Sequence, residues 1–245
     1  MIDVVFLSVV NKILTNLESK GIIFDKLEAF IKKFYTNELI KGIILFIGLG
    51  LLYFIFTLLI EYFLWLSTTG RTVLFWLFVA VEAFLLIRFI AFPLFKLFKL
   101  QKGINYEEAS QIIGNHFTEV QDKLLNFLQL SNQKQPSELV LASIEQKATS
   151  LQPIPFSNAV NFSKNKKFLP YAIIPVLLLI LFFVTGNSAV ISNSFDRVVN
   201  YETKYAPPAP FEFVILNKSL TAQQNADFVL QVKTQGKVMP ENVSI

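Results

Sequence analysis

Residues 42–66 read GIILFIGLGLLYFIFTLLIEYFLWL, an apolar run with one charged residue. About 20 apolar residues in a helix cross the ~30 Å hydrocarbon core of a bilayer. Residues 73–95 and 168–184 form two further runs of this kind. Because a chain in lipid must satisfy its own backbone hydrogen bonds, each run is expected to be a helix. The sequence therefore predicts an α-helical membrane protein with three transmembrane helices, two of them forming a hairpin over residues 41–96 and the third at 168–187.

The composition agrees with this class and argues against an enzyme. Of 245 residues, 53% are hydrophobic and 16% charged, and the mean hydropathy is +0.51. The chain outside the apolar runs is too short for a large soluble domain. Without cysteine there are no disulfides, thiolate metal sites or cysteine nucleophiles, and the single histidine, His116, cannot build an ordinary metal site alone. We expect no catalytic residues, no metal and no cofactor.

Lysines gather beside the apolar runs, and this explains the net charge of +4 better than a nucleic-acid partner does. The positive-inside rule makes these flanks cytoplasmic, with the N-terminus inside and the C-terminus outside. The first span is expected to act as an uncleaved insertion signal. The lysines are Lys32, Lys33 and Lys41 before the first run, Lys96, Lys99 and Lys102 after the second, and Lys164, Lys166 and Lys167 before the third.

Residues 1–40 carry apolar positions at helical spacing, which predicts amphipathic cytoplasmic helices separated at Gly21. Two interpretations of the stripe stay open. The helices lie on the inner leaflet, or the stripe packs against the protein's own cytoplasmic hairpin, and both can hold. The positions are Val5, Val9, Ile13 and Leu17 before Gly21, and Phe24, Leu27, Ile31 and Phe34 after it.

Residues 97–167 predict a cytoplasmic helical hairpin. Asn105 and Glu108 form a capping-box pattern at the start of one long helix. Pro136 and Ser137 open a second helix, prolines end it, and residues 156–162 return to the bilayer as an extended linker. The inward positions are Ala109, Ile113, Phe117, Val120, Leu124 and Phe127 in the first helix, and Leu139, Val140, Ser143, Ile144 and Leu151 in the second.

Beyond the third span, residues 188–210 predict a short juxtamembrane helix and a Pro-rich linker. From residue 211 the apolar period becomes two, in runs at 211–215, 228–232 and 243–245 with polar turns at 217–219 and 235–237. This predicts the start of a sandwich-like β domain on the outer side of the membrane, over residues 211–245. Because such sandwiches have about seven strands, the domain is expected to be truncated and the polypeptide to be longer.

Ionisable residues inside the spans are the candidate functional residues, because such groups are expensive in lipid. If the hairpin turns near Thr69, Thr57 faces Glu82 and Glu61 faces Phe78, so both glutamates share one interface. They then form either a proton or ion relay or a structural contact between helices or with a partner.

Arg88 completes this set of intramembrane polar residues. It lies about 9 Å along the helix and about 120° around the axis from Glu82, so a direct ion pair is not expected. Snorkelling to the cytoplasmic headgroups or pairing with another chain is expected instead.

A resemblance to a known family rests on residues 113–117, 122–126, 128–130, 142–147, 153–156, 165–167, 210–213 and 217–220. These segments resemble the family called domain of unknown function 4175, whose members are large inner-membrane proteins of Gram-negative bacteria. The resemblance implies three N-terminal membrane helices followed by a periplasmic part with immunoglobulin-like domains, and hence a multi-pass protein of the bacterial inner membrane. It implies no reaction. Members from gliding-type bacteria suggest a role in the cell envelope or a secretion apparatus, by analogy.

Together these features favour a non-enzymatic membrane anchor or scaffold that links cytoplasmic and periplasmic partners. The expected partners are the lipid bilayer and other proteins, or further copies of the chain in a homo-oligomer. The alternative is an ion-coupled transporter or motor subunit that uses Glu61 and Glu82, which requires oligomerisation because three spans are too few for a pore. Transmembrane signalling is a weaker hypothesis. A membrane-bound hydrolase comes last, since no nucleophile has a base nearby.

Overall fold

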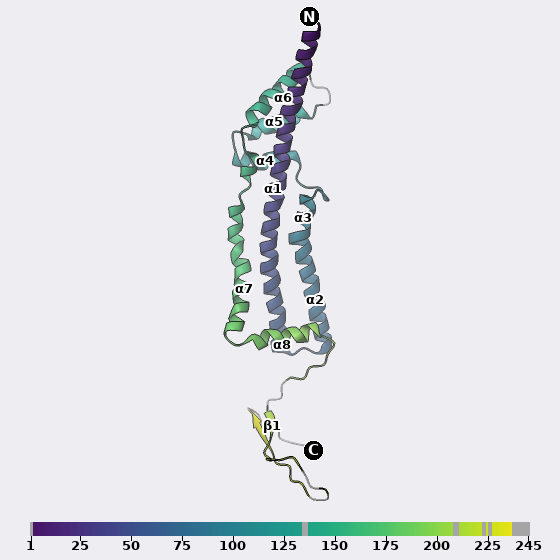
Figure 1. The fold of residues 1–245 in the computed structure, drawn as a ribbon, viewed down its shortest axis with the longest axis vertical. Coiled ribbons are helices and arrows are strands. Elements are labelled where there is room, and N and C mark those ends of the chain that lie inside the picture. Colours follow the sequence, from purple (N-terminus) through teal and green to yellow (C-terminus); the bar gives the residue numbers. More distant parts are fainter. Residues whose placement is uncertain (1, 134–136, 208–210, 222–223, 225–226, 237–245) are drawn as a thin grey trace.

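The computed structural model describes residues 2–133, 137–207, 211–221, 224 and 227–236, and the side chains at residue 14 and from residue 17 onward. The described fold is mostly helical (Figure 1). Three helical segments are long and apolar enough to cross a membrane, Leu17–Leu64, Thr68–Leu97 and Phe156–Val184. The prediction of three membrane-spanning helices is confirmed at this level.

The first span and the N-terminal segment form one continuous helix, α1 (Ile2–Leu64). The prediction of separate amphipathic helices broken at Gly21 is therefore wrong. A glycine inside a helix is unfavourable by only about 1 kcal/mol relative to alanine. The helix continues because Ile23, Leu27 and Phe30, just beyond the glycine, are completely buried.

A helical bundle packs against the N-terminal part of α1 and consists of α4 (Tyr106–His116), α5 (Gln121–Ser131) and α6 (Glu138–Leu151) (Figure 1). This confirms the second interpretation for the part of the stripe after Gly21. Its members after Gly21 pack against the chain's own hairpin. The side chains of Val5, Val9 and Ile13 lie outside the described residues. The core joins Ile23, Leu27 and Phe30 to Ala109, Ile113, Val120, Leu124, Phe127, Ile144, Ala148, Leu151 and Phe156.

The hairpin of the bundle differs from the prediction in its first helix. The capping box of Asn105 and Glu108 is confirmed. The single long helix is wrong, because the chain folds back between α4 and α5 and brings Gly114 against Gln121. Both halves keep their apolar residues on the same core, so the stripe could not reveal the turn. In α6 the prediction places Ile144 and Leu151 correctly but Leu139 wrongly, since it is 81% exposed. Pro136 lies outside the described residues.

The second span begins with α2 (Thr68–Leu86), passes through a π-helical turn (Ile87–Ala91) and ends in α3 (Phe92–Leu97). The π turn lies just before Pro93. Proline has no N–H and its ring clashes with the carbonyl four residues earlier, so a wider turn accommodates it. Arg88 lies in this turn.

The third span, α7 (Leu169–Val184), follows two short 3-10 turns (Phe156–Ala159 and Phe162–Phe168). The predicted extended linker at residues 156–162 is therefore wrong, because most of this segment forms 3-10 turns.

Beyond α7, helix α8 (Ser188–Val199) confirms the predicted short helix. It lies across the ends of the spans, far from the bundle (Figure 1), and packs on α1 and α2. We call this the α8 end and the opposite one the bundle end.

Three glycines of α1 bring the spans into close contact. A Cβ atom at Gly42 would overlap the backbone carbonyl of Phe89, and one at Gly48 would overlap that of Tyr171. At Gly50 the nearest atoms belong to the Glu82 carboxylate. Small residues of this kind allow membrane helices to approach closely.

The C-terminal segment contributes a two-stranded antiparallel sheet, β1 (Phe211–Ile215) with β2 (Val232–Gly236). The first predicted strand is confirmed. The second strand begins only at Val232, the last residue of the predicted 228–232 run. Before it, the Asn217 side chain donates a hydrogen bond to the Val229 carbonyl and accepts one from the Gln231 N–H, in place of strand pairing at these two groups. An immunoglobulin-like sandwich is not seen in the described part of the chain. The run at 243–245, with Lys237, Pro208 and Pro210, lies outside it.

Candidate functional site

Glu61 lies between two arginines at the α8 end. Its side chain is 0% exposed. One carboxylate oxygen, Oε1, lies 3.1 Å from Nε of Arg197 and 3.4 Å from Nε of Arg71. The three residues come from α1, α2 and α8. We call them the Arg-Glu-Arg cluster.

Each arginine has further partners that fix its position. Arg71 donates from Nε to the carbonyl of Leu66 at 2.9 Å and from Nη1 to the carbonyl of Thr203 at 2.7 Å. Its guanidinium also lies 5.0 Å from the ring centre of Tyr205. Thr203 and Tyr205 belong to the segment after α8, so the cluster also holds the start of the C-terminal linker.

Arg197 is held by its own helix and by an aromatic ring. It donates from Nη2 to Oγ of Ser194 at 3.3 Å, one turn earlier in α8. Its guanidinium lies 4.1 Å from the ring centre of Trp65, a cation–π contact. Trp65 has φ 44°, a left-handed conformation that is unfavourable for a bulky residue. This backbone conformation ends α1 and coincides with the placement of the ring on Arg197.

Buried ion pairs of this kind fix geometry more than they add stability. Removing the charges from water offsets much of their attraction, whereas removing one partner leaves an uncompensated buried charge. Oε2 of Glu61 has no hydrogen-bond partner among the described residues. The cluster therefore makes the relative positions of α1, α2 and α8 depend on one another.

The structure separates the two glutamates that the sequence placed together. The hairpin turns at residues 65–67, because Ser67 caps α2 and residues 68–70 are already helical. Phe78 stacks on Tyr53 rather than facing Glu61, and Glu82 lies at Gly50 rather than at Thr57. Gly50 and Glu61 are about 16 Å apart along α1 at 1.5 Å per residue, so the predicted shared interface is wrong.

The remaining predicted residues have separate surroundings. Thr57 is buried and donates to the carbonyl of Tyr53 in its own helix. Glu82 is partly buried, and its Oε1 is unpartnered among the described residues. Arg88 is exposed near the bundle end, 6.0 Å from the ring centre of Phe89. In the described part of the chain it forms no ion pair, in agreement with the geometry expected from the sequence.

Sequence reasoning missed Arg71 and Arg197 as the partners of Glu61. Arg71 is the only charged residue between the first two runs, a usable signal once the turn is placed at residue 66. Arg197 is harder to find from the sequence, because the apolar residues Phe195, Val198 and Val199 beside it do not reveal which face of the helix is buried. In the structure α8 buries Ile191, Ser194, Arg197 and Val198, whereas Phe195 and Val199 are 44% and 45% exposed.

Comparisons with known proteins found no relative: no family model, no curated protein and no solved structure matches the chain. The described residues also contain no group of three or more metal-ligating side chains. The resemblance to the domain of unknown function 4175 family stays a prediction.

Proposed function

We propose that the chain is a non-enzymatic anchor or scaffold of the bacterial inner membrane that links protein partners on the two faces of the bilayer. The observation that carries this proposal is the continuity of α1. One helix supplies the buried core of the bundle through Leu27 and Phe30 and also holds Glu61 at the α8 end. A displacement at either end is therefore transmitted through a single rigid element.

The proposed orientation places the bundle in the cytoplasm and α8 with the C-terminal strands in the periplasm. It is supported by the lysines at the bundle end of all three spans. A role in an envelope, secretion or gliding complex follows from the family resemblance. The immunoglobulin-like domain is likewise part of the proposal, supported by the antiparallel pairing of β1 with β2.

Co-purification of the full chain from its native membrane in a mild detergent tests the scaffold. We expect capture through the chain to recover proteins of both compartments in one complex. Ile40→Pro would interrupt α1 between the bundle and the span, while Ile40→Ala, at the same 38% exposed position, leaves it helical. Proline should reduce joint recovery and alanine should not. Recovery of the chain as a lone monomer would overturn the proposal.

An ion-coupled transporter or motor subunit is the second candidate, because Glu82 carries an unpartnered carboxyl oxygen inside a span. Glu61 supports this candidate less, since two arginines already hold it. Proton flux in vesicles containing the native complex distinguishes the two functions. Flux that is lost in Glu82→Gln with assembly unchanged would favour transport, and flux unchanged by the substitution would exclude a relay through Glu82.

A further inference from the structure

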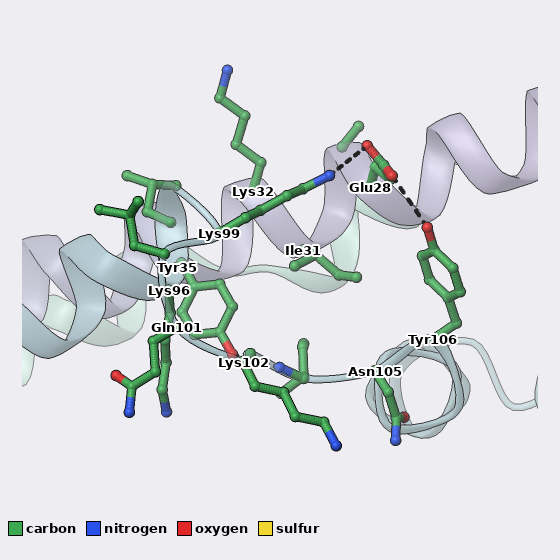
Figure 2. A pocket seen from close by; sticks show the side chains of 15 residues that line it. Glu28, Ile31, Lys32, Tyr35, Lys96, Lys99, Gln101, Lys102, Asn105 and Tyr106 are labelled. Carbon is green, nitrogen blue, oxygen red and sulfur yellow. Dashed lines mark hydrogen bonds and ion pairs between the residues drawn. The ribbon is translucent and has the colours of Figure 1, made fainter.

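A basic pocket lies at the bundle end of the second span, between α1 and the loop that follows α3 (Figure 2). Its volume is about 620 Å³. Four lysines and a single carboxylate, that of Glu28, line it. Apolar side chains complete the wall. The lysines are Lys32, Lys96, Lys99 and Lys102, and the apolar residues include Ile31, Leu97, Leu100 and Ile104.

The Glu28 carboxylate already has two hydrogen-bond donors within the pocket. Glu28 accepts from Lys99 Nζ at 3.0 Å and from the Tyr106 hydroxyl at 3.1 Å (Figure 2). Burial, with a further contribution from the bond to Glu28, raises the pKa of the Tyr106 phenol, which therefore remains a donor. Among the described residues, no carboxylate pairs with Lys32, Lys96 or Lys102. The pocket thus has an excess of positive charge.

The loop after α3, which carries Lys99 and Lys102, is fixed to α1. The Tyr35 hydroxyl accepts from the backbone N–H of Ile104 at 2.7 Å, and a Cβ atom at Gly103 would lie 2.8 Å from the same hydroxyl. Lys99 has φ 58°, a left-handed conformation in which glycine is favoured. The Lys99 side chain at this position makes the ion pair with Glu28 at the pocket.

The polar ends of the lining residues are not spread evenly. Figure 2 shows Lys96, Gln101, Lys102 and Asn105 directed to one side of the pocket and Lys32 to the opposite side. Lys96 is the last charged residue of an apolar helical segment that ends at Leu97. This side of the pocket therefore combines cationic and amide donors with apolar side chains at the end of a candidate membrane span.

We propose that this pocket binds the phosphate group of an anionic phospholipid, with the phosphate between Lys96 and Lys102 and the glycerol and first acyl carbons against the apolar wall. Lysine ammonium groups bind phosphate oxygens through charge-assisted hydrogen bonds. Basic pockets beside membrane helices recognise phosphorylated headgroups by the same chemistry. A soluble phosphate anion shares this chemistry without the apolar contact.

Native mass spectrometry of the full chain in detergent tests the site, with phosphatidylglycerol and phosphatidylcholine of identical acyl chains as probes. We expect preferential retention of phosphatidylglycerol. Lys96→Gln with Lys102→Gln should weaken it roughly thirtyfold. The control, Lys164→Gln with Lys166→Gln, removes the same charge from exposed lysines at the bundle end and should retain the lipid.

Three further outcomes are decisive. Inorganic phosphate that binds alone, in a manner dependent on Lys96 and Lys102, would keep the phosphate site but assign it to a soluble anion. Equal loss in the two double variants would overturn the proposal, because the attraction would then be diffuse. Equal binding of the two lipids by the unaltered chain would also overturn it, whether or not the variants fold.

Discussion

At the scale of single residues, the decisive contact is the carboxylate of Glu61 between Arg71 and Arg197. The sequence marks Glu61 as unusual because it is an acid within an apolar run. Its role depends on residues 10 and 136 positions away in the chain. Once both arginines are present, the glutamate is a structural connection between three helices. To carry protons, the Glu61 carboxylate would have to leave its two arginine partners and bind a proton instead.

Replacing Glu61 with glutamine should destabilise the folded chain by about 3 kcal/mol, because two buried guanidinium groups lose their counter-ion. Glu38→Gln is the matched control in the same helix, since Glu38 pairs with Lys41 at a partly exposed site. Its expected effect is below about 1 kcal/mol. Denaturant unfolding in detergent micelles measures both, and equal midpoints would show that the cluster does not hold the helices.

Lys99 offers a second test at this scale. Lys99→Gly and Lys99→Ala both remove the ion pair with Glu28, but only glycine accepts φ 58° without strain. The glycine variant should therefore be more stable than the alanine variant by about 1 kcal/mol. Thermal unfolding of the two proteins side by side measures this difference. An alanine variant as stable as the glycine variant would mean that the loop does not hold the left-handed conformation.

At the scale of elements, α1 organises the molecule. Its N-terminal part has an apolar stripe that the bundle covers, and its C-terminal part presents glycines to the neighbouring spans. The two parts have different surroundings but one helical path. Sequence reasoning identified both parts, yet it divided them because glycine is a frequent helix breaker.

The glycines of α1 should respond differently to alanine. Gly42→Ala and Gly48→Ala place a methyl group against the backbone of Phe89 and Tyr171, which cannot move independently, so each should destabilise by about 1–3 kcal/mol. Gly50→Ala meets only the mobile end of Glu82 and should have a smaller effect.

Gly21→Ala is the control for this series, because nothing lies within 4 Å of the added methyl group. It should stabilise the helix by up to about 1 kcal/mol through helix propensity. Unfolding midpoints of the four variants in one detergent provide the comparison. A uniform response would indicate that helix propensity, and not contact between spans, determines the effect.

At the scale of the whole molecule, the bundle and α8 lie at opposite ends of the spans (Figure 1). Because the chain contains no cysteine, single cysteines report membrane topology without background. Gln133→Cys and Glu202→Cys both lie at exposed positions. In the proposed orientation, an impermeant maleimide reaches position 202 from the periplasm and position 133 only after the inner membrane is opened. The reverse pattern would invert the topology.

The sequence by itself determined the spans, the capping box, most of the bundle core and the first strand, because each follows from local periodicity or a local hydrogen-bond pattern. The tertiary structure decided the continuity of α1, the turn between α4 and α5, the register of the hairpin and the partners of Glu61. The sequence places the turn between α1 and α2 about three residues too late. Each residue of α1 is therefore predicted to face a residue of α2 about two helical turns away from its actual neighbour. Pairing between distant residues depends on how whole helices pack, and a single residue's neighbours along the chain carry no record of that packing.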